Sequence, residues 1–110
     1  MASFFTRIIN REIPADIVYE DAHVVAFRDI NPQAPVHILI VPREEVEGLA
    51  KLPETGDHTH ILNAAKVIAE QEGLTNGYRL VINQGEDGGQ TVMHLHAHLL
   101  GGRKFGWPPG

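Results

Sequence analysis

The stretch from residue 93 to residue 100, Met-His-Leu-His-Ala-His-Leu-Leu, alternates histidine with small or large apolar residues. Because successive side chains of a β-strand point to opposite faces, the alternation predicts a strand with three imidazoles on one face and an apolar opposite face. The apolar face suits a core, and a three-histidine face on a strand indicates a functional site. The strand alone is compatible with catalysis or phosphate binding, with metal binding, and with chance exposure.

The length of 110 residues supports one hydrophobic core, so we expect a single domain over residues 1–110. Hydrophobic residues at 43% and charged residues at 21% are typical of a globular protein. The net charge of -5 offers no basic surface for nucleic acid or an anionic membrane. With no cysteine, disulfides and thiolate metal sites are excluded. The first residues lack the long apolar core of a signal peptide, and we expect a cytoplasmic protein.

The rest of the chain predicts the order helix, three strands, helix, two strands. The expected elements are a helix at 3–10 capped by Ser3, strands at 17–20, 23–28 and 36–41, one helical turn within 44–50, a helix at 55–72, and strands at 78–83 and 93–100. Strand 36–41 is apolar on both faces except at His37, as expected for a central strand. The short spacings between the early strands favour an antiparallel α+β sheet over a parallel one.

The glycine-rich loop at residues 83–91, Asn-Gln-Gly-Glu-Asp-Gly-Gly-Gln-Thr, leads directly into the histidines. Glycines allow backbone N–H groups to turn toward an anion without a Cβ in the way. In isolation such a loop is more often a flexible connection. Placed immediately before three histidines, it favours phosphate as the ligand, with Glu86 and Asp87 pointing to solvent.

A neutral imidazole is a nucleophile near pH 7, and attack on phosphorus forms a covalent nucleotidyl-histidine. The central histidine, His96, is the best candidate because a potential helper lies on each side. A protonated neighbouring histidine and loop N–H groups can stabilise the phosphoryl oxygens, and the Thr91 hydroxyl can donate to the leaving group. This chemistry requires no cofactor. The rival hypothesis is a zinc site at His94, His96 and His37, with Asp29 as another potential ligand.

The sequence His94-Leu95-His96-Ala97-His98-Leu99-Leu100 resembles the signature of the histidine triad (HIT) superfamily. The resemblance runs over essentially the whole chain, through 29–37, Asn83, Gly85, 87–90 and Gly101-Gly102-Arg103. The ending Trp107-Pro108-Pro109-Gly110 is similar to that of the histidine triad nucleotide-binding branch, which consists of purine nucleoside phosphoramidases. Thr91 stands where that branch commonly has serine, and 104–106 departs from its pattern.

The resemblance implies roles for individual residues. His96 would be the nucleophile, His98 would contact the α-phosphate, His94 would orient His96 through its main-chain carbonyl, and His37 would be a fourth histidine of the site. Asp29 would hold the ribose hydroxyls. The phosphate side would be lined by Asn83, Gly89, Gln90 and Thr91. The purine would lie against an apolar wall formed by Phe5, Ile8, Phe27, Ile30 and Leu39. His23, His58 and His60 match no such role and are expected at the surface.

The resemblance also implies a HIT-like fold whose five-stranded sheet is extended to ten strands in a homodimer, through the helix at 55–72 and the strand at 78–83. The implied activity is hydrolysis of nucleoside 5′-phosphoramidates to a nucleoside monophosphate and an amine. The alternatives are a dinucleoside polyphosphate hydrolase of the same superfamily and a nucleotide-binding regulatory or scaffold protein.

Overall fold

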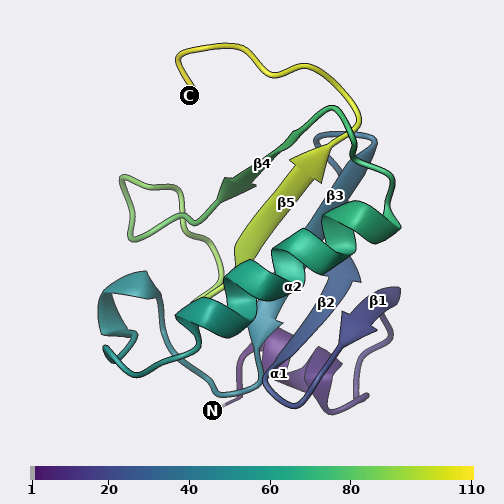
Figure 1. Cartoon of the computed structure of the whole chain (residues 1–110). Helices are drawn as coiled ribbons and strands as arrows, with labels where there is room; N and C mark the ends of the chain where they lie inside the picture. Colours follow the sequence, from purple (N-terminus) through teal and green to yellow (C-terminus); the bar gives the residue numbers. More distant parts are fainter. Residues whose placement is uncertain (1) are drawn as a thin grey trace.

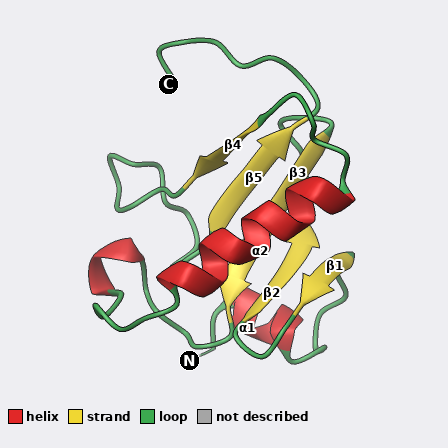
Figure 2. Ribbon diagram, in the orientation of Figure 1, coloured by secondary structure: helices red, strands yellow, loops and turns green. Residues whose placement is uncertain are grey.

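The computed structural model, which describes residues 2–110, is built on one antiparallel sheet of five strands in the order β1-β2-β3-β5-β4 (Figures 1 and 2). The elements in chain order are α1 Phe4–Ile9, β1 Ile17–Glu20, β2 Val24–Arg28, β3 Val36–Pro42, the 3-10 helix η1 Leu49–Lys51, α2 His58–Gln71, β4 Tyr78–Val81 and β5 Ala97–Gly101. The predicted α+β class, the antiparallel sheet and the central position of the third strand are confirmed.

Two helices of unequal length cover opposite faces of the sheet (Figure 1). The long helix α2 packs on one face and forms the main core with alternate strand residues such as Ile38, Ile40 and Leu99. The six-residue helix α1 packs on the other face, where Phe5 and Ile8 meet Phe27 and other strand residues. The same strands therefore serve a large core on one side and a smaller cluster on the other.

Helix α1 begins at the predicted cap. Ser3 has an extended backbone, and its hydroxyl accepts the backbone N–H of Thr6. This bond satisfies one of the N–H groups that have no partner within the helix. Phe5 and Ile8, three residues apart, fall on the buried face. Arg11, just beyond the helix, has a positive φ of 62°, and the chain turns there toward β1.

Helix α2 is shorter than the predicted 55–72 and begins at His58, with Asp57 at the N-cap position. The sequence predicts an apolar stripe on this helix formed by Ile61, Leu62, Ala65, Ile68 and Ala69, and this prediction is wrong at Leu62, which is 52% exposed. Ala64 takes the place of Leu62 in the buried face, because the helix packs through the row formed by Ile61, Ala65 and Ile68 and the small residues beside it. The helical turn predicted within 44–50 is present slightly later in the chain, as the 3-10 helix η1 at Leu49–Lys51.

The predicted strand at 93–100 was wrong at its start. Strand β5 begins at Ala97, so His94 and His96 lie in the irregular segment before it, and His98 lies within it. In that segment the Leu95 N–H donates to the Val46 carbonyl. The alternation itself persists, because Leu95, Ala97 and Leu99 all enter the core beneath α2.

Beyond β5, the C-terminal residues leave the sheet and run past β4 as an extended tail with Trp107 exposed (Figure 1). The guanidinium groups of Arg79 and Arg103 both lie against the Phe105 ring in this tail. Among residues 2–110, no helix has the length and apolar character needed to cross a membrane.

Candidate active site

A cavity of about 390 Å³ opens on the α1 face of the sheet. Its walls are mainly apolar, and its polar residues include His96, His98, Asp29 and Thr91. An apolar pocket with a few convergent polar groups is the usual form of a small-molecule site. The apolar lining includes all five residues predicted to surround a purine, namely Phe5, Ile8, Phe27, Ile30 and Leu39.

His96 lies against the inner wall of this cavity. Its Nδ1 is 2.8 Å from the main-chain oxygen of His94, and because a carbonyl can only accept, Nδ1 carries the proton. A neutral His96 then has its lone pair on Nε2. The Phe5 and His96 rings pack in a T-shaped arrangement, with centroids 4.9 Å apart and planes at 80°. The imidazole is thus held both by a hydrogen bond and by an aromatic contact.

His98 and His37 form a second hydrogen-bonded pair beside His96. The Gln33 backbone N–H donates to His37 Nδ1, at 3.0 Å, so the proton of a neutral His37 is on Nε2. That N–H donates to His98 Nδ1, at 2.9 Å. His98, which lines the cavity, consequently carries its own proton on Nε2 and can donate it to a ligand.

Both imidazoles of this pair are neutral near pH 7. Burial and the neighbouring rings of His96 and His37 lower the pKa of His98 to about 4, although Asp29 opposes the shift. Burial also lowers the pKa of His37. The expectation of a protonated histidine beside His96 was therefore wrong, because burial disfavours the charged form more than one nearby carboxylate favours it.

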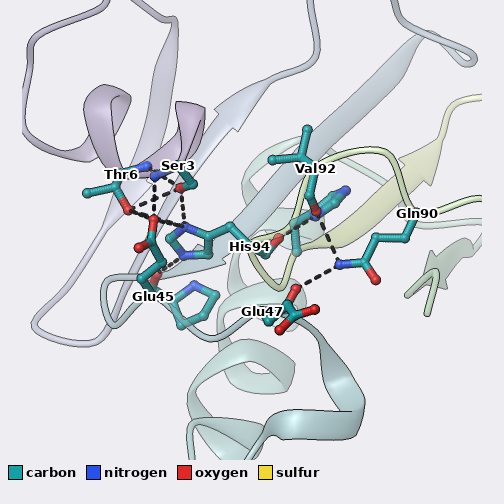
Figure 3. A network of polar contacts seen from close by, with 9 residues as sticks. Ser3, Thr6, Glu45, Glu47, Gln90, Val92 and His94 are labelled. Carbon is teal, nitrogen blue, oxygen red and sulfur yellow. Dashed lines mark hydrogen bonds and ion pairs between the residues drawn. The ribbon is translucent and has the colours of Figure 1, made fainter. Parts of the chain in front are cut away.

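His94 does not face the cavity with the other two. Its ring is fully buried, with Nε2 donating to the Pro42 carbonyl at 2.9 Å and Nδ1 lying 2.6 Å from the Ser3 hydroxyl oxygen (Figure 3). Burial lowers the pKa of His94, which is accordingly neutral. The ring of His94 lies on the α1 side of the sheet, as the alternation predicts, but it points toward the start of α1 and does not line the cavity with His96 and His98.

Asp29 stands at the mouth of the cavity. One carboxylate oxygen accepts the Asn31 backbone N–H at 2.8 Å, which is an Asx turn, and the other lies 3.5 Å from His37 Nε2. The turn anchors the side chain at the end of β2 without removing its charge. Ile30, next to it, lines the rim of the cavity but is 95% exposed.

The glycine-rich loop contributes fewer residues to the cavity than the resemblance implies. Thr91 lines the cavity, whereas Asn83, Gly89 and Gln90 are not among its lining residues. The Gly89 and Gln90 N–H groups donate within the loop, and the Gln90 side chain donates to the carbonyls of Glu47 and Val92 (Figure 3). Gln90 therefore connects the loop to Glu47. Glu86 and Asp87 are exposed, as predicted.

Metal-ligating groups gather at two places among the described residues. Asp29, His37 and His98 form one cluster, and His23, Asp57 and His60 form the other, at the surface near the start of α2. The second was not foreseen, and there the rings of His23 and His60 stack at 3.5 Å. The rival hypothesis of a zinc site at His94, His96 and His37 does not fit this structure, because both ring nitrogens of His94 are engaged.

The Asp29 cluster does not fit zinc as it stands. The facing nitrogens of His37 and His98 share a proton at 2.9 Å, whereas two imidazoles on tetrahedral zinc, each with a bond of about 2.0–2.1 Å, have nitrogens about 3.3–3.4 Å apart. A metal ion would have to displace the shared proton and separate the rings. The observed arrangement is that of a hydrogen-bonded chain.

Sequence reasoning missed the polar network behind His94, formed by Ser3, Thr6 and Glu45 (Figure 3). Ser3 was recognised as a helix cap, but its second partner lies 91 positions away. A local pattern carries no signal for such a contact.

Comparison with protein-family models gives a match to the HIT domain over residues 10–105. An uncharacterised HIT-like protein of Synechococcus elongatus is 59% identical, over 98% of this chain and 96% of its own length. A 14 kDa zinc-binding protein of Zea mays is 56% identical, with coverages of 98% and 88%. The adenylylsulfatase HINT1 of Arabidopsis thaliana is 51% identical, with coverages of 98% and 76%.

Solved structures at lower identity share the fold. A HIT family hydrolase from Legionella pneumophila superposes with a TM-score of 0.94 and 47% identity, over 99% of this chain and 100% of that one. A histidine triad nucleotide-binding protein from Candida albicans gives a TM-score of 0.85 and 31% identity, with coverages of 97% and 83%.

Proposed function

This chain belongs to the HIT domain family, and from that premise we propose that it is a purine nucleoside phosphoramidase acting through a nucleotidyl-His96 intermediate. The observation that carries the proposal is the opposite protonation of two neighbouring imidazoles. His96 offers a lone pair on Nε2, while His98 offers an N–H on Nε2. A nucleophile and a donor side by side are what displacement at a phosphate requires.

In the first step, His96 Nε2 attacks the α-phosphorus of a nucleoside 5′-phosphoramidate. An N–P bond forms and the P–N bond to the amine breaks. The leaving nitrogen accepts a hydrogen bond from the Thr91 hydroxyl and takes its proton from solvent. In the second step, water attacks the phosphorus, its proton goes to solvent, and the bond to His96 breaks. The products are a nucleoside monophosphate and a free amine.

Charge stabilisation comes from neutral donors in this scheme. The His98 N–H donates a hydrogen bond to a non-bridging oxygen of the α-phosphate. The hydrogen bond from His37 fixes the orientation of the His98 ring. The loss of charge on His98 is no disadvantage, because an oriented N–H in a water-poor site already stabilises negative charge that develops in the transition state. His94 acts through its carbonyl, which maintains the Nδ1–H form of His96.

The remainder of the cavity suits the nucleoside. Phe5, Phe27 and Leu39 provide apolar surface for a purine, and the Asp29 carboxylate is placed at the rim to accept hydrogen bonds from ribose hydroxyls. The cavity of about 390 Å³ matches the lower range of small-ligand pockets, about 300–1,000 Å³. The leaving group would lie in the adjoining groove, which shares Phe4, Thr91 and Val92 with the cavity.

A second candidate reaction is hydrolysis of adenylyl sulfate. The relative from Arabidopsis thaliana bears the name adenylylsulfatase. The same attack by His96 would release sulfate instead of an amine. Since the nucleotidyl intermediate is shared, the two reactions differ in the leaving group alone.

The zinc-binding name of the Zea mays relative prompts a separate question about metal. Zinc held by Asp29, His37 and His98 would replace the proton between the two rings and remove the donor from His98. We therefore assign the metal no step in catalysis. Added Zn²⁺ is expected to inhibit the metal-stripped enzyme, and activation would contradict the assignment.

The test is AMP release from adenosine 5′-phosphoramidate by metal-stripped protein, compared with a His96→Ala variant. Loss of the nucleophile is expected to lower the rate at least about a thousandfold, which corresponds to about 4 kcal/mol of barrier. Mass spectrometry of quenched protein should find AMP on His96. A variant that keeps its rate, or AMP trapped elsewhere, would refute the nucleophile. Adenylyl sulfate and a diadenosine polyphosphate are compared in the same assay.

Binding without turnover would identify a regulatory or scaffold protein instead. An inactive wild type that still binds AMP with a micromolar or tighter Kd would support that alternative. The matched control is Leu39→Ala, which removes part of the apolar wall and leaves the histidines intact. It should weaken AMP binding in either case.

We also propose that the functional unit is a homodimer in which two sheets join at β4. Strand β4 is at an edge of the sheet, and the exposed side chains of Tyr78 and Leu62 lie on β4 and α2 respectively. An exposed edge strand beside apolar surface is a common pairing site. Light scattering should give twice the chain mass, and Leu62→Glu should shift the protein toward monomer. A wild-type monomer would refute this arrangement.

A further inference from the structure

A short hydrogen bond joins Ser3 and His94, which are 91 positions apart in the sequence, with Ser3 Oγ 2.6 Å from His94 Nδ1 (Figure 3). From this contact we propose that Ser3 is a positioning residue for the nucleophile: it holds His94, whose main-chain carbonyl holds His96. The proposal rests on the proposed function for the role of His96. It extends that function to a residue at the cap of α1.

The direction of each hydrogen bond follows from its partners. The Pro42 carbonyl can only accept, so the His94 proton is on Nε2 and its lone pair is on Nδ1. That lone pair needs a donor, and the nearest is the Ser3 hydroxyl. The Ser3 oxygen at the same time accepts the Thr6 backbone N–H at 2.9 Å. One hydroxyl therefore caps the helix and donates to the imidazole.

The other polar groups nearby do not replace this donor. Thr6 Oγ1 is 3.3 Å from His94 Nδ1 but only 2.9 Å from Glu45 Oε1, and a carboxylate is the stronger acceptor for its proton. Bonds from Ser3 and Thr6 lower the pKa of Glu45 and keep it ionised. Glu45 Oε1 itself is 3.9 Å from His94 Nδ1, which is beyond hydrogen-bond range.

Removal of the Ser3 hydroxyl would leave a fully buried ring nitrogen without a donor. A buried acceptor in that condition is unfavourable, and the ring can relieve it by moving its proton to Nδ1, toward Glu45, which gives up the bond to Pro42. The backbone of residue 94 would then lose its anchor. His96 depends on that backbone, because the His94 oxygen is what keeps the proton of His96 on Nδ1 and the lone pair on Nε2.

Helix α1 thereby acts on the site in two ways. Phe5 lines the cavity and packs against the His96 ring, while Ser3 at the cap holds His94. The two roles are separable in kinetics. Damage to the wall would raise KM, whereas loss of orientation of His96 would lower kcat.

The experiment compares Ser3→Gly with Ser3→Thr. Glycine is tolerated at helix caps nearly as well as serine but has no hydroxyl, whereas threonine keeps both cap and donor. With adenosine 5′-phosphoramidate, Ser3→Gly is expected to lower kcat about tenfold and to leave KM within about twofold, while Ser3→Thr stays within about twofold of wild type on both. Imidazole ¹⁵N spectra should show a single Nδ1–H form of His96 in the wild type and Ser3→Thr, and a mixture in Ser3→Gly.

Two results would overturn the proposal. One is a Ser3→Gly variant with wild-type kcat and an unchanged His96 spectrum. The other is a raised KM at constant kcat, which would mean that Ser3 stabilises the cavity wall alone. If the wild-type protein releases no AMP, the proposed function fails. The ¹⁵N spectra of His94 and His96 would still decide whether Ser3 sets their protonation.

Discussion

The two faces of the sheet are built from the same strands but differ in what covers them. Under the 14-residue helix α2, the strand residues are sealed into a continuous core. Under the six-residue helix α1, the cover is incomplete, and a cavity remains above Leu39, His96 and His98. Polar groups are tolerated on that face because each buried nitrogen has a partner. The length of the covering helix thus separates a stabilising face from a reactive one.

Neighbouring residues of β3 provide the most direct test of this contrast. Ile38 faces α2 and Leu39 faces the cavity. Ile38→Ala should lower the free energy of unfolding by about 2–5 kcal/mol, because it leaves a void in a close-packed core. Leu39→Ala should lower it by only about 2 kcal/mol, the lower end of that range, because one side of Leu39 already borders the cavity. Urea unfolding measures both losses.

In the kinetics the order of the two substitutions should be reversed, with the larger effect from Leu39→Ala. Leu39→Ala should raise KM for the nucleotide, and Ile38→Ala should leave KM and kcat unchanged in the folded fraction. Equal destabilisation by the two substitutions, together with an unchanged KM for Leu39→Ala, would show that the faces are not functionally distinct.

Acid should act on the reactive face through its neutral histidines. In the unfolded chain the pKa of a histidine is near 6.5, whereas burial lowers the pKa of His98 to about 4 in the folded protein. Between these values the unfolded state binds more protons than the folded state. The contribution of neutral His98 to the free energy of unfolding is therefore fully present above pH 6.5 and is lost as the pH falls toward 4. The loss from His98 is of order 3 kcal/mol, and burial of His37 and His94 adds to it in the same direction.

The measurement is the free energy of unfolding in urea at several values between pH 4 and pH 7, for wild type and His98→Asn. The variant should show a shallower decline with acid. A parallel decline in both proteins would mean that the pKa of His98 is not depressed.

The contrast also explains how much could be predicted from the sequence. Alternation placed Leu95, Ala97 and Leu99 in the core and made His96 and His98 candidates for one site, because both inferences need only the local direction of side chains. The start of β5 could not be predicted, since main-chain groups of His94 and Leu95 bond to His96 and Val46 instead of continuing the strand. Leu62 was misplaced because its apolar character does not reveal which side of α2 is covered. The contact between Ser3 and His94 is a tertiary contact between residues 91 positions apart, so no local pattern predicts it.

Asp29 allows a smaller and more specific test of the reactive face. Asp29→Asn preserves an oxygen for the Asx turn with Asn31 but removes the charge. We expect KM to rise about tenfold, or about 1.4 kcal/mol, because hydrogen bonds from ribose hydroxyls to a charged acceptor are stronger than those to an amide. A 2′,3′-dideoxy substrate is the control, and it should be bound equally by both proteins. A tenfold difference that persists with this substrate would exclude ribose as the partner.

Thr91 should show the smallest effect, and one that depends on the leaving group. It lies where the nucleotide cavity meets the adjoining groove, and its side chain is exposed, so neither face of the sheet loses packing when it changes. Thr91→Ser keeps the hydroxyl and should stay within about twofold in kcat/KM, whereas Thr91→Val should lose about threefold to fivefold with a phosphoramidate, the scale of one exposed hydrogen bond. An amine needs a proton to leave, but sulfate departs as a stable anion. The loss in Thr91→Val should therefore disappear with adenylyl sulfate, and an equal loss with both substrates would place the Thr91 hydroxyl on the phosphate rather than on the leaving group.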